Sequence, residues 1–200
     1  MANPIEFYFD FSSPYAYLAA TRIDDLASHY GRTVKWRPML LGAAMKETGQ
    51  RPLLEIPIKG EYTKHDVARF ARLLNLKFRM PAVFPFAAVS PSRAFYWLDA
   101  RDPSLAKRFA KAVFRQAFTD GRDVTSLDFV CDLAQGMGVD REALKAGITS
   151  PEGKERLRAE VEAAVNRGVF GSPFIYVDGE PFWGADRLAQ VEEWLVTGGW

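Results

Sequence analysis

The sequence predicts an α/β fold in which one small sheet, built from both ends of the chain, is interrupted by a large all-helical insertion. Three observations predict it: a strand–helix–strand pattern in residues 1–38, helical signals throughout residues 39–167, and a strand–strand–helix pattern in residues 168–200. Because neither half of the sheet could bury both of its faces alone, a shared sheet is favoured over two independent domains. We therefore expect residues 1–38 and 168–200 to form one domain and residues 39–167 to form a helical insertion domain.

The N-terminal segment contains two strand-like stretches joined by a helical one. Residues 5–10 (IEFYFD) and 33–37 (TVKWR) are rich in aromatic and β-prone residues. Between them, Ser13 is a suitable N-cap, and apolar residues recur with helical spacing as far as Tyr30, where Gly31 suits the end of the helix. A helix that connects two neighbouring strands places them parallel, so this segment predicts a βαβ unit.

The middle of the chain contains repeated helix starts and no clear strand. Residues 62–76 place an apolar face at helical spacing, and residues 80–91 (MPAVFPFAAVSP) are too rich in proline for a continuous helix. Five further helix starts are predicted: Ser90-Pro91, Pro103-Ser104, Ser126, Asp140 and Ser150-Pro151. No fixed period is visible, so a helical solenoid is not expected.

The C-terminal segment predicts a hairpin followed by a helix. Residues 174–177 (FIYV) are strand-like, Asp178-Gly179 is a hairpin turn signal, and residues 181–183 (PFW) begin the return strand. The final helix is expected to start after Gly184, with Asp186 as its N-cap.

The charges are nearly balanced, with 26 Lys and Arg against 25 Asp and Glu and a net charge of +1. This balance provides no general attraction for nucleic acid or an anionic membrane, and no stretch reaches the roughly 20 apolar residues needed to span a bilayer. The N-terminus lacks a basic region followed by an apolar run, so no secretory signal is expected and we expect a cytoplasmic protein. With one cysteine, Cys131, and two histidines, neither an internal disulfide nor a metal site is expected.

Ser13 is the first candidate functional residue, because it stands where a predicted strand enters a helix. Free N–H groups and a partial positive charge of about half a unit at a helix N-terminus stabilise an anion. A serine hydroxyl at that point can donate to a bound thiolate or oxyanion. The alternative is that Ser13 only caps the helix, since serine is common at this position.

Two further turns near the C-terminus could contact a ligand. In GVFGSPF, a cis Ser172–Pro173 bond would turn the N–H and C=O of Ser172 outward, where an extended ligand backbone could pair with them. In WGADR, Gly184 would allow a carboxylate to approach the helix end, and Asp186 could bind an ammonium group. The alternatives are an ordinary strand-entry proline and a simple helix cap.

A basic segment, KETGQRP at residues 46–52, could hold a carboxylate. Arg51 can bind such a group through two parallel hydrogen bonds. The alternative is a solvated loop.

Together these turns resemble those of a known family. The order βαβ, helices, ββα resembles a thioredoxin-like fold with a helical insertion, as in disulfide oxidoreductases of the DsbA type. There the first helix opens with Cys-x-x-Cys, whereas here the corresponding stretch is Ser12-Ser13-Pro14-Tyr15, which excludes dithiol chemistry. The sequence is similar instead to the glutathione-dependent branch, 2-hydroxychromene-2-carboxylate isomerase and the kappa-class glutathione transferases. Four motifs carry this resemblance: FYFDFSSPYAYL (7–18), KETGQRP (46–52), GVFGSPF (168–174) and FWGADRL (182–188).

The resemblance implies glutathione as the cofactor and gives roles to particular residues. Ser13 matches the active-site serine that hydrogen-bonds the glutathione sulfur. Ser172 matches the residue before the cis-proline, Pro173, whose backbone pairs with the cysteine of glutathione. The segment that holds the γ-glutamyl end matches four residues: Trp183, Gly184, Ala185 and Asp186. The polar groups near the substrate carboxylate match three: Lys46, Gln50 and Arg51.

The implied reaction interconverts 2-hydroxychromene-2-carboxylate and trans-o-hydroxybenzylidenepyruvate, two small aromatic carboxylates, in aromatic catabolism. A free thiol has a pKa of about 8.5, which a hydroxyl such as that of Ser13 and a helix N-terminus would lower. Two alternatives remain open. One is a kappa-class-like transferase or peroxidase, which consumes glutathione, and the other is a non-catalytic thioredoxin-fold binding module. The resemblance also implies a homodimer.

Overall fold

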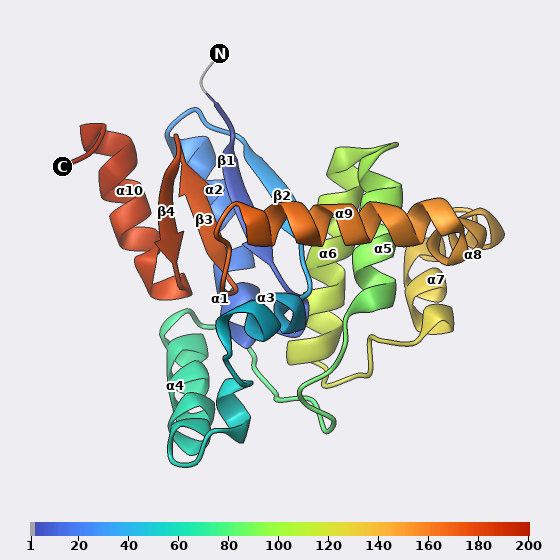
Figure 1. The fold of residues 1–200 in the computed structure, drawn as a ribbon, viewed down its shortest axis with the longest axis horizontal. Helices are drawn as coiled ribbons and strands as arrows, with labels where there is room; N and C mark the ends of the chain where they lie inside the picture. Colours follow the sequence, from blue (N-terminus) through green and yellow to red (C-terminus); the bar gives the residue numbers. More distant parts are fainter. Residues whose placement is uncertain (1–2) are drawn as a thin grey trace.

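The computed structural model describes residues 3–200 and contains a four-stranded sheet in the order β2-β1-β3-β4 (Figure 1). Its strands are β1 (Ile5–Phe9), β2 (Val34–Pro38), β3 (Phe174–Val177) and β4 (Glu180–Trp183). β1 and β2 are parallel, β3 is antiparallel to β1, and β4 is antiparallel to β3. The predicted βαβ unit and the hairpin are therefore confirmed, and both ends of the chain share one sheet.

The helices fill the middle of the chain, as predicted. They are α1 (Pro14–Ala20), α2 (Ile23–His29), α3 (Leu41–Thr48), α4 (Lys59–Leu73), α5 (Val89–Asp99), α6 (Pro103–Phe118), α7 (Leu127–Gln135), α8 (Arg141–Thr149), α9 (Pro151–Asn166) and α10 (Leu188–Thr197), with short 3-10 turns η1 (Leu53–Glu55) and η2 (Ala185–Arg187). Ser126, Asp140 and Ser150 each accept a hydrogen bond from the first turn of the helix that they were expected to start.

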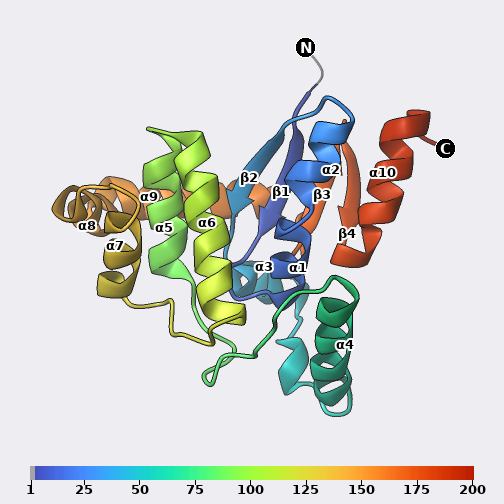
Figure 2. The ribbon, with the colours of Figure 1, turned by 180° about the vertical axis from the view of Figure 1, so that it is seen from behind.

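The helices between β2 and β3 lie in two places rather than in one block. Helices α5 to α8 pack together beside the sheet, whereas α3 and α4 lie near α1 at one edge of it (Figure 1). Helices α2 and α10 cover one face of the sheet (Figure 2), and α9 crosses the other. Arg37 on β2 joins that second face to α9, because its guanidinium bonds both Glu6 at 2.9 Å and Glu160 at 3.2 Å.

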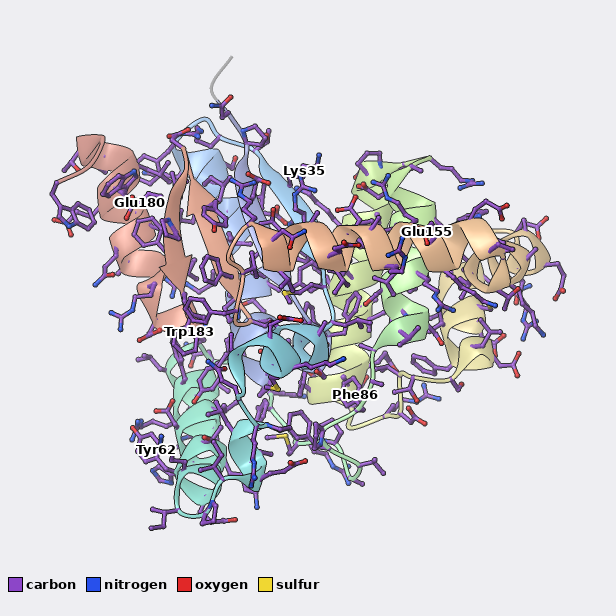
Figure 3. The ribbon with its side chains drawn as sticks, in the orientation of Figure 1. Lys35, Tyr62, Phe86, Glu155, Glu180 and Trp183 are labelled. Atoms are coloured by element: carbon purple, nitrogen blue, oxygen red, sulfur yellow. The ribbon has the colours of Figure 1, made fainter. Side chains whose placement is uncertain are left out.

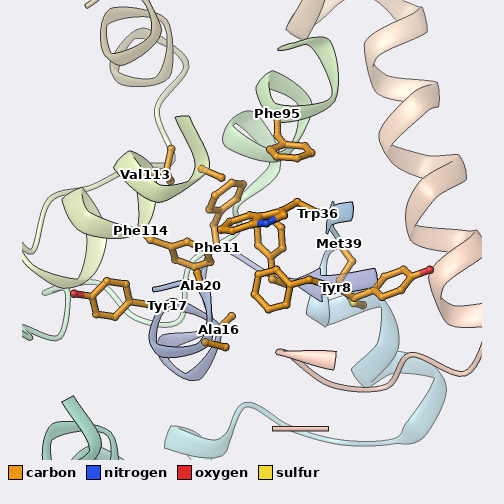
Figure 4. Close-up of a cluster of buried hydrophobic side chains, with 14 of the residues drawn as sticks. Tyr8, Phe11, Ala16, Tyr17, Ala20, Trp36, Met39, Phe95, Val113 and Phe114 are labelled. Atoms are coloured by element: carbon orange, nitrogen blue, oxygen red, sulfur yellow. The ribbon is translucent and has the colours of Figure 1, made fainter. Parts of the chain in front are cut away.

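An aromatic core joins the sheet to the helices beside it. Phe114 on α6 lies 5.5 Å from Phe9 and 5.1 Å from Phe11, measured between ring centroids. Phe95 on α5 lies 6.0 Å from Phe9, and Trp36 packs edge-on against the same ring at 5.3 Å (Figure 4). Because these rings are buried, β1 cannot leave the helices without exposing them.

The single helix expected up to Tyr30 is wrong, since the segment forms two helices. α1 ends at Ala20 and α2 begins at Ile23. At the break, the Thr21 hydroxyl donates to the carbonyl of Leu18 at 2.8 Å, so the side chain competes with the backbone for a helical acceptor. Apolar side chains continue at helical spacing through the break, which is why the sequence pattern did not reveal it.

The expectation that Asp186 caps the final helix is also wrong. Asp186 lies inside the 3-10 turn η2, its side chain makes no capping hydrogen bond, and α10 starts at Leu188. Gly184 stands before this turn with φ of 119°, a left-handed conformation that favours glycine. The chain therefore turns at Gly184 and passes through one tight turn before the helix.

Candidate active site

The candidate active site lies at the edge of the sheet where β1, β2 and β4 end and β3 begins. The strand register places Phe174 opposite Tyr8 near the end of β1, and Trp183 opposite Phe174 at the end of β4. Helix α1 starts at the same edge, a short turn after β1. Trp183 marks this edge in Figure 3.

Ser13 is the N-cap of α1, as predicted. Its Oγ accepts a hydrogen bond from the Ala16 N–H at 3.1 Å and donates to the carbonyl oxygen of Ser172 at 2.8 Å. The Ser13 side chain is buried. One hydroxyl thus caps the seven-residue helix α1 and joins two turns that lie 159 positions apart in the sequence.

The Ser172–Pro173 bond is cis, but the Ser172 carbonyl does not face outward as the sequence suggested. It points at Ser13, because the Ser13 hydroxyl lies within hydrogen-bond distance. The Ser172 hydroxyl accepts from the Asp10 N–H at 2.8 Å, and the Pro173 carbonyl accepts from the Gly184 N–H at 3.1 Å. These bonds bring all three predicted turns into one cluster.

Trp183 forms the exposed side of this cluster, with 51% of its surface accessible. Its ring lies 4.8 Å from that of Phe170, at a steep angle. A Cβ at Gly171 would lie only 2.1 Å from Trp183 Nε1, so the indole rests directly on the Gly171 backbone. The glycine therefore makes room for the tryptophan next to Ser172.

Gly184, Ala185 and Asp186 follow Trp183 on the same side. A Cβ at Gly184 would lie 2.3 Å from Asp186 Oδ1, so the carboxylate of Asp186 folds back against the Gly184 backbone. That carboxylate is 63% exposed and lies 3.4 Å from the Arg187 guanidinium. Ala185 is buried. Asp186 thus presents an accessible negative charge beside Trp183.

Lys46, Gln50 and Arg51 have exposed side chains. Lys46 is in the last turn of α3, and the other two follow the helix in the sequence. The structure joins the start of α3 to the Ser13 turn, because the Leu41 N–H donates to Asp10 Oδ2 at 2.6 Å. The three polar side chains lie at the opposite end of that helix and beyond it.

Two features at this edge were missed by reasoning from the sequence. The first is Asp10, a buried carboxylate that was expected only as the last residue of a strand. Burial raises the pKa of Asp10, and the N–H groups of Leu41 and Ser12 that donate to it act in the opposite direction. An aspartate two residues before Ser12 was the signal available in the sequence.

The second feature is a hydrogen-bonded link between α1 and α4. The Tyr15 hydroxyl donates to Asp66 at 2.7 Å, and Asp66 also pairs with Arg69. Burial and the bond to Asp66 raise the pKa of Tyr15, so its hydroxyl keeps its proton at neutral pH. Because the residues are 51 positions apart, no local pattern could have indicated the contact.

The cluster offers a buried hydroxyl, backbone groups around Ser172, a half-exposed indole and an exposed carboxylate. Such a set can bind a small molecule that carries an ionisable group, a peptide backbone and an ammonium group. Among residues 3–200, no group of three or more histidine, cysteine, aspartate or glutamate side chains is placed to hold a metal ion. Within the same described part of the chain, no helix is long and apolar enough to cross a bilayer.

Comparisons with known proteins show the family of this chain. The family model described as DSBA-like thioredoxin domain matches residues 4–196. The 2-hydroxychromene-2-carboxylate isomerase of Sphingobium xenophagum is 32% identical over 98% of this chain and 100% of the relative. Glutathione s-transferase kappa 2 of Caenorhabditis elegans is 26% identical over 96% and 91%. A solved structure of 2-hydroxychromene-2-carboxylate isomerase has a TM-score of 0.87 and 28% identity, covering 96% of this chain and 93% of that one.

The fold and the cluster at Ser13 define a DsbA-like thioredoxin protein whose first helix opens without cysteine. Within that class, the chain belongs to the 2-hydroxychromene-2-carboxylate isomerase family. The thioredoxin-like fold with a helical insertion is therefore confirmed.

Proposed function

We propose that this protein is a glutathione-dependent isomerase that interconverts 2-hydroxychromene-2-carboxylate and trans-o-hydroxybenzylidenepyruvate, or a closely related aromatic acid. The proposal depends above all on the 2.8 Å hydrogen bond between the Ser13 hydroxyl and the Ser172 carbonyl. That bond places a hydroxyl donor and a peptide acceptor side by side, in a chain 32% identical to a relative named for this isomerisation.

The residues of the cluster fit glutathione. Ser13 would hold the sulfur, the Ser172 backbone and Pro173 would hold the cysteine of the tripeptide, and Asp186 would hold the ammonium of its γ-glutamyl end. Trp183, Gly184 and Ala185 would form the wall beside that end. Bound glutathione would supply a nucleophilic thiol that an isomerisation returns unchanged.

The Ser13 hydroxyl must change its partner for this role. Its hydrogen points at the Ser172 carbonyl, so donation to a thiolate requires the hydroxyl to rotate away. The rotation would leave the Ser172 carbonyl free to accept an N–H from a bound peptide backbone. The Ala16 N–H can keep donating to Ser13 Oγ throughout, which holds the oxygen in place. Recognition of a thiolate and of a peptide backbone would therefore be coupled in one exchange of hydrogen bonds.

Lys46, Gln50 and Arg51 are proposed to hold the carboxylate of the aromatic substrate. Their exposed cationic and amide groups suit an acid that enters from solvent. We further propose a cytoplasmic homodimer that acts in aromatic catabolism, and sedimentation at the monomer mass would count against the dimer.

The decisive experiment follows glutathione and 2-hydroxychromene-2-carboxylate through turnover by the wild type and by Ser13→Ala. We expect the wild type to convert the acid without net loss of thiol, and Ser13→Ala to lower turnover by about tenfold or more, because one positioned donor contributes on the order of 10²–10³ in comparable sites. Ser126→Ala is the matched control, since Ser126 Oγ caps α7 with the same 3.1 Å bond that Ser13 Oγ makes to α1. Each variant loses about 0.5–2 kcal/mol of capping. Because Ser13→Ala also loses the bond to the Ser172 carbonyl, the melting temperatures of both variants are measured, and turnover is compared at a temperature where both are folded. Equal turnover in the two variants would remove Ser13 from the mechanism.

A kappa-class-like transferase or peroxidase is the second candidate, favoured by the kappa-class relatives. Net consumption of thiol would support it over the isomerase. An unchanged melting temperature at millimolar glutathione, together with no turnover, would favour a non-catalytic binding module.

A further inference from the structure

Asp10 connects three segments of the candidate site through its own four polar atoms. Its N–H donates to Ser172 Oγ at 2.8 Å, and its carbonyl accepts from the Ser13 N–H at 2.9 Å. Its Oδ1 accepts from the Ser12 N–H at 2.8 Å, and its Oδ2 accepts from the Leu41 N–H at 2.6 Å. The two backbone groups and the two carboxylate oxygens thus join the Ser12-Ser13 turn, the Ser172 loop and the start of α3.

The bond to Leu41 caps α3 from outside its own segment. Leu40 is the N-cap residue of that helix and has no side-chain group that could accept a hydrogen bond. The Asp10 carboxylate takes this role, and its negative charge lies at the helix end where the backbone dipole favours an anion. Because the bond is made 31 positions away in the sequence, it fixes where α3 begins relative to the Ser13 turn.

The carboxylate is held by N–H groups rather than by a cation. Asp10 is 4% exposed, and among residues 3–200 it forms no ion pair with a lysine, arginine or histidine. A buried carboxylate is costly unless its oxygens are hydrogen-bonded, and here each oxygen has a backbone partner. The carboxylate therefore holds two backbone segments together, the Ser12-Ser13 turn and the start of α3.

We infer that Asp10 is a positioning residue, which sets the distance between the thiol-binding turn at Ser13 and the substrate-binding end of α3 by holding both to one carboxylate. This inference rests on the proposed function, because it assigns the two sides of the reaction to the two segments that Asp10 joins. Oδ1 fixes the turn that carries Ser13, and Oδ2 fixes the helix that carries Lys46.

Two variants separate these contacts. Asp10→Asn replaces one oxygen by an amide that cannot accept from a backbone N–H, so one of the two carboxylate bonds is lost. Leu41→Pro removes the N–H that reaches Oδ2, at the first helical position, where proline is tolerated best. Leu41→Ala keeps that N–H and controls for the partly buried leucine side chain, which the proline variant also loses. Asp24→Asn is the control, since Asp24 is a partly buried aspartate that also accepts hydrogen bonds, but from Trp36, Lys107 and Lys111.

The experiment measures the pKa of the bound glutathione thiol from its ultraviolet absorbance, together with kcat and KM for 2-hydroxychromene-2-carboxylate. We expect Leu41→Pro to raise KM for the acid by about tenfold, because even a small displacement of a segment that positions the substrate weakens its binding. The pKa of the bound thiol should stay unchanged. We expect Asp10→Asn to lower kcat as well and to shift the thiol pKa upward. Asp24→Asn is expected to match the wild type in all three.

The outcomes distinguish this inference from the proposed function. If the wild type binds and uses glutathione while Asp10→Asn and Leu41→Pro both behave like Asp24→Asn, Asp10 has only a structural role and the inference is wrong. If Asp10→Asn does not fold, Leu41→Pro alone decides, because an unchanged KM in a folded protein overturns the link to α3. If the wild type neither binds glutathione nor converts the acid, the proposed function fails and the inference fails with it.

Discussion

At the scale of single residues, Gly171 leaves no room for a side chain beside the Trp183 indole. We expect Gly171→Ala to fold, because the clashing atom belongs to the half-exposed Trp183 indole, which can move into solvent. The new Cβ would otherwise lie 2.1 Å from Trp183 Nε1. If Trp183 forms the wall beside glutathione, the dissociation constant for glutathione should rise by about tenfold, as for the loss of one well-packed aromatic contact.

Calorimetric titration of Gly171→Ala with glutathione checks this prediction. Gly42→Ala is the control, because a Cβ at Gly42 meets no atom within 4 Å. That substitution lies in α3, where alanine is a better helix former than glycine, so stability should stay equal or rise. Equal glutathione affinity in both variants would show that the Trp183 position is unimportant for binding.

Single residues also show how much of the candidate site the local sequence could predict. The Ser13 cap follows from residue types and their neighbours, and the structure confirms it. The residues alone left open whether the Ser172–Pro173 bond is cis, which only the family resemblance implied, and the structure has it cis. Asp10 and Tyr15 were missed because the partners that join them to other segments lie 31 to 162 positions away, where no local rule applies. Asp186 was assigned as a cap because its type fits one, but the left-handed Gly184 redirects the chain.

At the scale of elements, Asp24 on α2 fixes the sheet side of the molecule to α6. Its carboxylate accepts from Lys107 at 3.0 Å and from Lys111 at 2.8 Å. Burial raises the pKa of Asp24, but the hydrogen bonds from Lys111 and Lys107 lower it by more, so the net pKa lies below its usual value. The carboxylate of Asp24 therefore ionises more easily in the folded protein than in the unfolded chain, so its ionised form stabilises the fold.

This lowered pKa determines how stability depends on pH. The stabilisation is fully present above the unfolded pKa of about 3.9 and is lost as the pH falls through the lower folded value. We expect Asp24→Asn to reduce the free energy of unfolding by about 1.5–3 kcal/mol at neutral pH, as for hydrogen bonds to a charged group. The difference from the wild type should shrink when the pH drops below about 4.

Urea unfolding at neutral and acidic pH measures this difference. Asp25→Asn is the control on the same helix turn, because Asp25 is exposed. A loss of stability in Asp24→Asn that is the same at both pH values would contradict the ionic origin of the effect.

The elements themselves were largely predictable, whereas their spatial grouping was not. Helix starts at Ser126, Asp140 and Ser150 are marked by a capping side chain, which acts within one turn. The break at Thr21 was missed because the apolar pattern on both sides supports the same core. The Tyr15–Asp66 hydrogen bond joins α4 to α1, and the local sequence does not predict a contact between residues 51 positions apart.

At the scale of the whole molecule, a thioredoxin-like domain and an insertion domain are separate stretches of the sequence, but their side chains pack in one core. The buried rings of β1 contact those of α5 and α6 in one aromatic cluster (Figure 4). A boundary at residues 38 and 168 therefore passes through a shared core. Composition and periodicity identify the segments, but they do not tell whether two segments bury their apolar faces against each other or separately.

The shared core leads to a prediction about cooperativity. Phe114 is 1% exposed on α6 and contacts Phe9 and Phe11 of the sheet side, so Phe114→Ala should remove about 3–5 kcal/mol from the unfolding free energy of the whole chain. Urea unfolding followed by far-ultraviolet circular dichroism, which reports mainly the helices, should then coincide with unfolding followed by tryptophan fluorescence. Phe129→Ala, on the outer helix α7 where Arg122 covers the ring, should cost less and leave the two transitions equally coincident. Two separate transitions in Phe114→Ala would mean that the sheet and the helices fold independently, and that the aromatic cluster is only a contact between them.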